Sequence, residues 1–378
     1  MKIIVAKNDL LSTLRTCQAT VVKSASDLSG QYLFRIQPGS KDQVEVLTYA
    51  DRCNTLAQLK CQLEPSDVSS FTFEAKRLDL WLEAVPDEAI TFTHQNGKTT
   101  AECSLGTQEF GSLDPSSFPL ADSLIAQAVA IATVKADHLK ALLSRVKPFI
   151  SVNDAKEAPL CQAQFRDGFL YATDRATAIG VKTPEFAKSP ISVTQKSMGA
   201  LLQFLTQCGD ADVTVKEQER IICYALGTQA VFCESRNTQA KFPLLQLGFD
   251  QASPYVWELE VKALRKILPF LISAAPADDT RVLFQPGDTP DYIQVGMRVQ
   301  AGGVKYLPFP AKKSQTADAQ KIDRETFRLP YEMLLRLLDA SSEDTMKLGI
   351  HPKGESGWCR LNDVQDGQEC FVVVVWKN

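Results

Sequence analysis

The feature that most constrains the fold of this 378-residue chain is a weak internal repeat. An amphipathic segment with leucines at helical spacing occurs three times, beginning near residues 5, 134 and 259. Its matching leucines are Leu10, Leu139 and Leu264, followed four residues later by Leu14, Leu143 and Leu268. The copies are therefore separated by 129 residues (10 to 139) and 125 residues (139 to 264). Such a period predicts a fold made of similar units placed one after another.

A second helical segment recurs in each copy, at residues 71–82, 191–202 and 327–338, and each begins with a strand-like tripeptide. Short alternating runs of apolar and polar residues predict strands between and after the helices. The clearest hairpin joins residues 161–165 to 169–173 through Asp167 and Gly168, a common turn pair. In the third copy, the stretch Pro308–Asp323, rich in Pro, Lys, Ser and Asp, is predicted to be a solvated loop.

These patterns predict an α+β fold of three tandem domains, at residues 1–125, 126–252 and 253–378. In each domain we expect two helices packed on antiparallel sheets, because the apolar residues of each helix lie on one face.

Composition is that of a globular protein, with 44% hydrophobic residues, 23% charged residues and a net charge of −4. No apolar run reaches the roughly 18 residues of a membrane helix, and residues 1–5 are predicted to be a strand, not a signal peptide. A cytoplasmic protein is therefore expected. The ten cysteines form no CxxC pair, which favours free, buried thiols in a reducing compartment over disulfides or metal ligands.

The whole chain resembles one known family, the bacterial DNA sliding clamp (the beta subunit of DNA polymerase III). The resemblance depends on the order and spacing of short segments rather than on a single motif. These segments are Met1-Lys2, Leu10-Leu11, Ala75-Lys76-Arg77, Val85-Pro86-Asp87, Phe118-Pro119, Ala172-Thr173-Asp174 and Lys241-Phe242-Pro243. The resemblance implies three clamp-type domains per chain and a ring formed by a head-to-tail homodimer. In such a ring, helices line a central hole that holds duplex DNA.

Two segments depart from the family pattern. Family members usually continue Ala-Thr-Asp with Gly-His-Arg-Leu, whereas Arg175-Ala176-Thr177-Ala178 follows here. They usually end in Met-Pro-Met-Arg-Leu, whereas this chain ends in Val374-Val375-Trp376-Lys377-Asn378. In the family, both segments line the pocket that binds short peptide motifs of the DNA polymerase and the clamp loader. The chain is therefore expected to be a divergent clamp.

Basic residues are concentrated on the predicted helices and at their ends, where the resemblance implies contacts with DNA phosphates. The candidate DNA-binding residues are Lys7, Arg15, Lys23, Lys76, Arg77, Lys140, Arg145, Lys147, Lys156, Lys196, Lys262, Arg265 and Lys266. Lys135 and Arg336 lie on the same segments. Phosphate contacts of this kind are independent of sequence and permit sliding. The alternative is that these side chains are merely solvated on polar helix faces.

By correspondence with the family, the peptide pocket is expected between the second and third domains. Its candidate residues are Thr173, Asp174, Arg175, Thr177, Pro243, Leu247, Met333, Val373, Val374, Val375 and Trp376. An aliphatic groove with a few polar anchors suits a short linear motif. The alternative is that residues 372–375 form only a buried edge strand.

An enzyme is not expected. The three histidines, His94, His138 and His351, are far apart in the sequence and match no metal-ligand spacing. No phosphate-binding glycine motif follows a predicted strand, so we expect no cofactor. The predicted function is a non-catalytic DNA sliding clamp that tethers the polymerase. The alternative is a clamp-fold scaffold that binds peptides or regulates other proteins without encircling DNA; a hydrolytic enzyme is a more distant third possibility.

Overall fold

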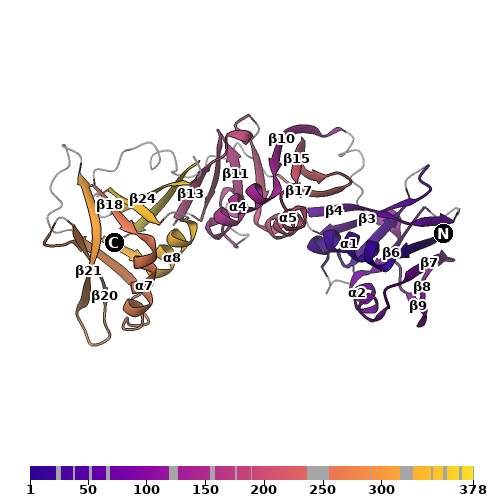
Figure 1. The fold of residues 1–378 in the computed structure, drawn as a ribbon, viewed down its shortest axis with the longest axis horizontal. Coiled ribbons are helices and arrows are strands. Elements are labelled where there is room, and N and C mark those ends of the chain that lie inside the picture. Colours follow the sequence, from indigo (N-terminus) through magenta and orange to yellow (C-terminus); the bar gives the residue numbers. More distant parts are fainter. Residues whose placement is uncertain are drawn as a thin grey trace. The chain divides into compact units, whose positions relative to one another are not determined.

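The structure is a computed structural model of the chain (Figure 1). It describes residues 1–22, 27–36, 39–50, 53–64, 69–118, 127–153, 158–174, 177–188, 190–235, 255–289, 291–315, 327–341, 344–351, 356–365 and 368–377. Contacts divide the chain into two compact units. The first comprises residues 1–143 and 191–237, and the second comprises residues 144–190 and 238–378. The three-domain boundaries expected from the repeat stay a prediction.

Each of the six longer helices among the described residues begins directly after a strand. The helices are α1 (Lys7–Cys17), α2 (Ala75–Ala84), α4 (Ala136–Val146), α5 (Gln195–Cys208), α7 (Val261–Ile272) and α8 (Tyr331–Ala340). The strands that precede them are β1 (Lys2–Ala6), β6 (Ser70–Glu74), β10 (Val129–Lys135), β14 (Ile191–Thr194), β18 (Tyr255–Glu260) and β22 (Phe327–Pro330). The change from period 2 to period 3.6 in the sequence therefore marks each strand–helix boundary correctly.

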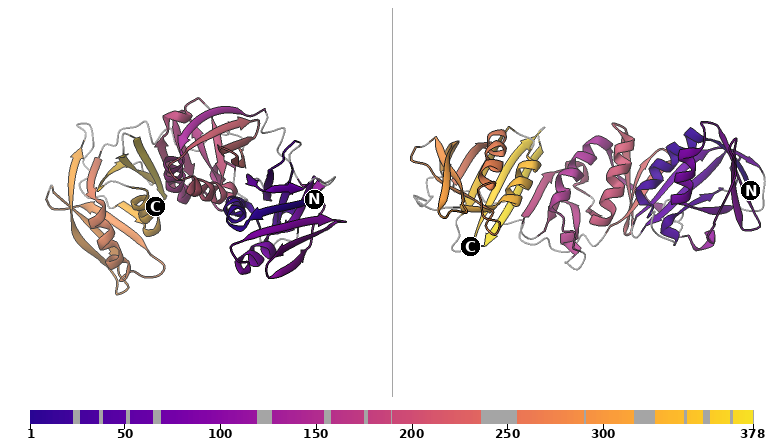
Figure 2. Two further views of the ribbon diagram at one scale, coloured as in Figure 1. Left: turned by 45° about the vertical axis from the view of Figure 1, so that its right-hand side comes forward. Right: turned by 90° about the horizontal axis from the view of Figure 1, so that it is seen from below.

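The first compact unit contains two antiparallel sheets. The five-stranded sheet has the order β5-β1-β7-β8-β9, and the eight-stranded sheet has the order β10-β15-β16-β17-β4-β3-β2-β6. Figure 2 shows the helices of the first repeat, in indigo and purple, beside its strands. The strands not yet defined are β2 (Gln31–Arg35), β3 (Gln43–Ala50), β4 (Cys53–Lys60), β5 (Gln62–Glu64), β7 (Ala89–Gln95), β8 (Lys98–Cys103), β9 (Gly106–Phe110), β15 (Asp212–Gln218), β16 (Ile221–Leu226) and β17 (Gln229–Glu234).

The second compact unit is organised around one series of antiparallel strands, in the order β11-β12-β13-β25-β24-β23-β18-β21-β20-β19-β22. Their bounds are β11 (Gln162–Arg166), β12 (Phe169–Thr173), β13 (Thr177–Lys182), β19 (Arg281–Pro286), β20 (Tyr292–Arg298), β21 (Val304–Gln315), β23 (Thr345–His351), β24 (Ser356–Gln365) and β25 (Gln368–Lys377). The predicted α+β class is thus confirmed, with the helices packed on antiparallel sheets.

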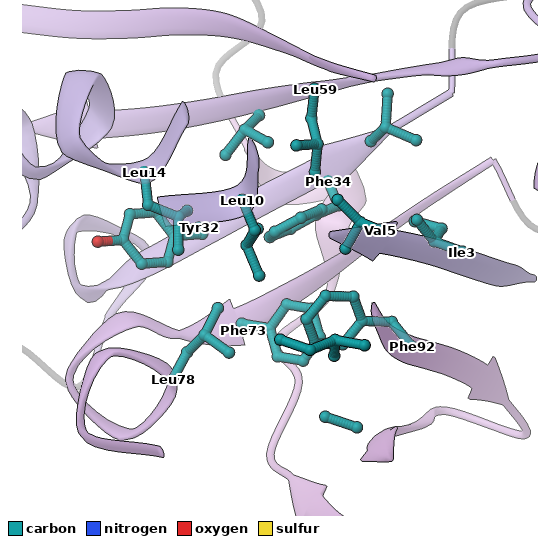
Figure 3. Packing of buried hydrophobic residues seen from close by; sticks show 14 of the residues in the cluster. Ile3, Val5, Leu10, Leu14, Tyr32, Phe34, Leu59, Phe73, Leu78 and Phe92 are labelled. Atoms are coloured by element: carbon teal, nitrogen blue, oxygen red, sulfur yellow. The ribbon is translucent and has the colours of Figure 1, made fainter. Parts of the chain in front are cut away.

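The core of the first repeat is strongly aromatic (Figure 3). Leu10 and Leu14 of α1 and Leu78 of α2 are fully buried between the two sheets. They pack with Phe34, and Phe73 lies edge-on to it with ring centroids 5.1 Å apart. Burying an aromatic side chain contributes a few kcal/mol each. The leucines that define the repeat are therefore the residues that bury each helix against its sheet.

Two strand pairs join the ends of neighbouring repeats. At the first junction β4 pairs with β17, from Ala230 opposite Leu56 to Cys233 opposite Cys53. At the second junction β13 pairs with β25, from Thr177 opposite Val374 to Val181 opposite Cys370. After its first helix, each repeat has three consecutive antiparallel strands, here called its first hairpin group: β2–β4, β11–β13 and β19–β21. In each junction the third strand of one repeat's first hairpin group pairs with the last strand of the next repeat. The sheets therefore continue from one repeat into the next.

The structure corrects two predictions in the third repeat. The predicted loop Pro308–Asp323 is wrong for residues 308–315, which belong to β21; residues 316–323 lie outside the described residues. The two prolines at positions 308 and 310 suggested a loop, but they are tolerated because β20 covers only one edge of this part of β21. The edge-strand alternative for residues 372–375 is also wrong, because β25 pairs with β13 on one side and β24 on the other.

Candidate DNA interface, partner pocket and open strand edges

Helices α1 and α5 lie side by side over the first junction. Both contact β4, and Gln207 of α5 donates from its amide to the carbonyl of Arg15 at a distance of 2.7 Å. Arg15 is exposed at the end of α1, and its guanidinium has no ion-pair partner among the described residues. Lys196 is exposed in the first turn of α5, where Thr194 caps the helix by accepting from the Ser197 amide at 3.3 Å. These two candidates therefore lie on adjacent solvent-exposed helix faces.

Lys7, at the start of α1, is less available. Its ammonium donates to the carbonyl of Val85, the residue that follows α2, and the side chain is half-buried. An ammonium has three donors, so it retains some capacity for a phosphate, but its position is set by α2. Here sequence reasoning found a basic residue and missed its structural partner, which is 78 residues away.

Helix α2 presents Lys76 and Arg77 to solvent. Arg77 lies 4.0 Å from Glu74, a pair of exposed charges that contributes little to stability. Of the two acids on this helix, Asp79 and Glu83, Asp79 lies nearer and is already engaged, since it accepts from the hydroxyl of Tyr32 at 3.1 Å. Lys76 and Arg77 therefore form an exposed positive pair, and Asp79 is already hydrogen-bonded to the buried Tyr32.

On and beside α4, Lys140 and Arg145 are half-buried and Lys147 is exposed. Lys135, which precedes the helix, forms an exposed ion pair with Asp212 at 3.1 Å. The buried face of α4 consists of Leu139, Leu142, Leu143 and Val146. The predicted amphipathic helix is thus confirmed; its contacts with DNA stay a prediction.

The basic residues of α7 differ in how they are held. Lys262 pairs with Asp344, and this hydrogen-bonded pair raises the pKa of Lys262. Arg265 donates to the carbonyl of Leu338 and lies 3.2 Å from Asp339, so it satisfies the last turn of α8. Lys266 is exposed. Arg265 thus joins two helices, a role that the sequence pattern did not indicate. Lys23 and Lys156 lie outside the described residues.

The candidate pocket residues on β12 and β13 form a polar turn in the second compact unit. Asp174 accepts from the amide of Thr177 at 2.7 Å and from its hydroxyl at 3.0 Å. The hydroxyl of Thr173 donates to the carbonyl of Thr177 at 2.7 Å. Both threonines are buried, and the turn leads directly into the second junction.

An ion pair joins this turn to α8. Arg336 donates to the second carboxylate oxygen of Asp174 at 2.9 Å, with side chains 38% and 19% exposed. Met333, one helical turn earlier on α8, is half-buried. Sequence reasoning placed Arg336 among the residues that face DNA, whereas the structure places it beside the candidate pocket.

The backbone of the C-terminal segment lies next to the same turn. Val374 is opposite Thr177 and Val373 is opposite Ala178 in the second junction. Val375 and Trp376 pair on the other side with β24, opposite Trp358 and Gly357. The structure thus brings together Thr173, Asp174, Thr177 and the strand from Val373 to Trp376, and Arg336 links them to α8, the helix that carries Met333. Arg175, Pro243 and Leu247 lie outside the part of the chain that the structure describes.

Two further strands have an edge with no described partner. β9 ends the five-stranded sheet and pairs only with β8. Residues 304–310 of β21 pair with β20 on one edge, and no described strand lies along the other. These two strands are the counterparts of the strands that form the two junctions, since β9 follows β8 as β17 follows β16, and β21 follows β20 as β4 follows β3.

The alternation of the backbone indicates which residues offer hydrogen-bonding groups at each open edge. The amide of Ala311 donates toward β20, to Asp291 at 2.9 Å, and the carbonyl of Lys305 also points at β20, against Gly296. The even-numbered residues therefore face the open edge of β21: Val304, Tyr306, Pro308 and Pro310. In β9, the two-residue turn Ser104–Leu105 directs Gly106 and Gln108 to β8 and leaves Thr107 and Glu109 facing outward.

No group of three or more potential metal ligands occurs among the described residues, and no helix in that part of the chain is long and apolar enough to cross a membrane. His94 stacks on Phe71 at 5.4 Å and bonds to Thr99 at 2.7 Å, contacts that are typical of a structural histidine. Its partial burial and the nearby N-terminus lower its pKa.

No protein-family model matches the sequence, and no curated protein matches it either. The fold, in contrast, matches solved structures along the full chain. The pol III beta structure from Caulobacter crescentus has a TM-score of 0.83 at 14% identity, covering 100% of both chains. The DNA polymerase III subunit beta from Pseudomonas aeruginosa has a TM-score of 0.82 at 13% identity, again covering 100% of both chains.

A sliding clamp from Bartonella birtlesii bound to griselimycin has a TM-score of 0.81 at 15% identity, covering 99% of this chain and 98% of that chain. These identities are low, but the coverage leaves no part of the fold unmatched. The chain therefore has the fold of the bacterial DNA polymerase III beta sliding clamps, in a strongly divergent sequence.

Proposed function

We propose that this protein is a DNA sliding clamp, a non-catalytic cytoplasmic subunit that encircles duplex DNA and tethers a DNA polymerase. Two copies form the ring, joined head to tail, and other replication or repair proteins, including a clamp loader, bind through short peptide motifs. The observation that carries the proposal is that β9 and β21 each have an edge without a described partner, whereas the equivalent strands of the other repeats pair with one another.

One rule of pairing is seen at the two junctions. β4 joins β17, and β13 joins β25, so the third strand of each first hairpin group joins the last strand of the next repeat. Applied to the third repeat, the same rule joins β21 to β9, the last strand of a first repeat. A second copy supplies that strand, and two such contacts close a dimer by symmetry. The proposed register places Val304 opposite Glu109 and Tyr306 opposite Thr107, so that their outward backbone groups meet.

The chemistry of the two edges limits this pairing to a short ladder. Pro308 and Pro310 have no amide hydrogen, so the open edge of β21 offers donors only at Val304 and Tyr306. Such prolines also protect an exposed edge against unspecific pairing. Exposed apolar side chains flank both strands: Leu105 in the turn before β9, and Phe270, Tyr292 and Val304 on or beside β21. Isolated apolar residues are common on surfaces, but here they flank complementary edges.

DNA is proposed to contact the basic residues of the helices through its phosphates only. The most available are Arg15, Lys76, Arg77, Lys147 and Lys266, all of which are exposed. Lys262 is held by an exposed carboxylate, Asp344, which a phosphate can replace at little cost because exposed pairs are weak. Weak, sequence-independent contacts are sufficient when the ring itself prevents escape.

The peptide pocket is proposed around the Asp174 turn and α8. The Asp174–Arg336 pair fixes the turn against the helix, and Met333 supplies a deformable apolar surface. A partner motif of aliphatic residues with a polar anchor matches this chemistry. The altered segments at 175–178 and 374–378 imply that the preferred motif differs from that of other clamps.

The test is retention on circular and linear DNA. The protein is loaded onto a nicked circular plasmid with its loader or at high protein concentration, and is then passed through a sizing column in moderate salt. A closed ring stays on the circle and leaves the same plasmid after it is linearised. Equal, weak binding to both forms, together with a monomer by sedimentation, would exclude the ring.

That second outcome favours a clamp-fold scaffold that binds partner peptides without encircling DNA. The specific observation behind this alternative is that Lys7, Lys262 and Arg265 already have partners in the protein. Neutralising Lys76 and Arg77 separates the two functions. A sliding clamp then binds duplex DNA less tightly and is loaded onto circular DNA less efficiently, whereas a scaffold keeps its peptide affinity and shows no change in its activity.

A further inference from the structure

Cys53 and Cys233 lie directly opposite each other in the first junction. Their sulfur atoms are 3.8 Å apart, and both residues are buried, at 3% and 0% exposure. They are 180 positions apart in the sequence and come from different repeats. Both are free thiols in this structure.

The sheet geometry suits a covalent bond between them. The two-residue turn Gly227–Thr228 makes Gln229 face β16, and by alternation Phe232 faces β4 while Cys233 does not. Cys53 and Cys233 therefore occupy a non-hydrogen-bonded position, where opposite Cα atoms are about 4.5 Å apart and the side chains are closest. This spacing falls within the range of about 4.4–6.8 Å that disulfides span, so the backbone need not move.

The environment indicates which sulfur reacts first. Cys233 hydrogen-bonds to Ser197 and to Cys53, and the contact with Cys53 together with burial raises the pKa of Cys233. It therefore stays a thiol near neutral pH. Cys53 is the first residue of β4, at the end of a hairpin, and is the more exposed of the two. A molecule as small as hydrogen peroxide reaches such a position when the end of the strand opens transiently.

We propose that Cys53 and Cys233 are an oxidation site, which a hydroperoxide converts into a disulfide that fastens the first repeat to the second. In the first step the Cys53 sulfur attacks one peroxide oxygen, the O–O bond breaks, and Cys53 becomes a sulfenic acid with release of water. In the second step the Cys233 sulfur attacks the Cys53 sulfur; the S–O bond breaks and a second water leaves. Two thiols lose two electrons in total, and one peroxide is reduced to two waters.

The disulfide constrains the chain more than the strand pair does. It closes a loop across 180 positions, and long loops give the largest loss of entropy in the unfolded chain. The oxidised protein is therefore expected to unfold at a higher temperature, with Tm raised by roughly 10 °C. The site does not depend on DNA or on ring closure, since both cysteines belong to one chain and one compact unit.

The experiment treats the full-length protein with excess hydrogen peroxide, alkylates the remaining thiols after unfolding, and identifies linked peptides by mass spectrometry. The expected result is a peptide pair joined through Cys53 and Cys233, two fewer alkylated thiols than the ten of the reduced chain, and a raised Tm that dithiothreitol reverses. Recovery of both cysteines as alkylated thiols, or of Cys53 as an unlinked sulfinic acid, would overturn the proposal.

Variants then localise the effect. Cys53→Ala and Cys233→Ala should each abolish the peroxide-dependent rise in Tm. The matched control is Cys223→Ala, on the neighbouring strand β16, which is equally buried at 5% exposure and should retain the full rise. A rise that persists in Cys53→Ala would assign the effect to other thiols. Because the peptide mapping uses the unmodified protein, poor folding of a variant does not remove the test.

Discussion

The two junctions between repeats have the same strand geometry but different chemistry. The first is apolar: Leu56, Ala230 and Phe232 are buried in a cluster on one face of the sheet, and the two thiols meet on the other. The second carries an ion pair at its edge, Asp174 with Arg336, and a network of threonine hydroxyls. Antiparallel pairing thus sets the arrangement, while the side chains decide what each junction can do besides holding the repeats together.

This difference is consistent with the proposed roles. A junction whose side chains are mostly apolar and buried resists change. The Asp174–Arg336 pair at the edge of the second junction is partly exposed, so it can exchange its contacts for those of a peptide. β9, which we propose to form the third junction between copies, is exposed at its first four residues, which suits an interface that would open when DNA is loaded. The following predictions test this order, from the largest effect to the smallest.

The largest effect is expected from Thr107→Pro in β9. Thr107 directs its amide away from β8, so proline removes a donor from the open edge and obstructs the approach of another strand. We expect the dissociation constant of the dimer to rise about 100-fold or more, measured by sedimentation, with loss of retention on circular DNA.

The matched control for this variant is Gln108→Pro. Gln108 directs its amide to β8, so a proline at this position removes a hydrogen bond within the sheet. It should therefore lower Tm even in the monomer. A dimer that withstands Thr107→Pro would show that β9 is not the interface, and would remove the third junction from the comparison.

A smaller effect, on stability, is expected from Phe232→Ala in the first junction. Phe232 is buried at 4% exposure within the apolar cluster, and its loss leaves a cavity. We expect the free energy of unfolding of the first compact unit to fall by about 3–5 kcal/mol, measured with urea. Phe232→Leu, which refills most of the space, should cost about 1–2 kcal/mol. Equal costs for the two variants would mean that the site is not tightly packed.

The sequence predicted all six helices, and it predicted β17 and β25, but it missed their partners β4 and β13 in the two junctions, and it missed β21. The helices were found because one face is buried, so that leucines recur at a fixed period. β4, β13 and β21 were missed because each has neighbours along both edges or mixed burial, which removes the alternation of period 2. Cys53–Lys60, for example, includes Leu56, Ala57 and Leu59, all buried, and Gln58 and Lys60, which are common in helices.

The partners of charged side chains could not be predicted from the sequence either. Nothing in the spacing of Asp174 and Arg336 indicates that residues 162 positions apart form an ion pair. The same holds for Lys7 with Val85 and for Arg265 with Leu338. The pattern of charges on a helix predicts which face is solvated, but only the packing of the neighbouring elements decides which cations are already bound within the protein.

At the second junction, Asp174→Asn should cost about 1 kcal/mol. The amide keeps an acceptor for Thr177 but loses the charge that attracts Arg336, and the pair is only partly shielded from water. Combined with Arg336→Met in a double-mutant cycle, we expect a coupling energy of about 0.5–1 kcal/mol that declines in high salt. A coupling near zero would contradict the view that this ion pair holds the turn against α8.

The smallest effect distinguishes the cations of the two junctions. Arg15, beside the first junction, has no described ion-pair partner, whereas Arg336, beside the second, is bound to Asp174. Arg15→Ala should therefore lower the slope of log affinity against log salt for duplex DNA by about 1, and weaken binding equally for all sequences. Arg336→Ala should leave the slope unchanged and instead alter the affinity for partner peptides. Both are measured by fluorescence anisotropy, with Lys188→Ala, an exposed residue outside the six α-helices, as the control. If Arg336→Ala lowers the slope as much as Arg15→Ala, then the ion pair opens readily and DNA competes for the second junction as well. The two junctions would then share one electrostatic role, and their different side chains would matter only for stability.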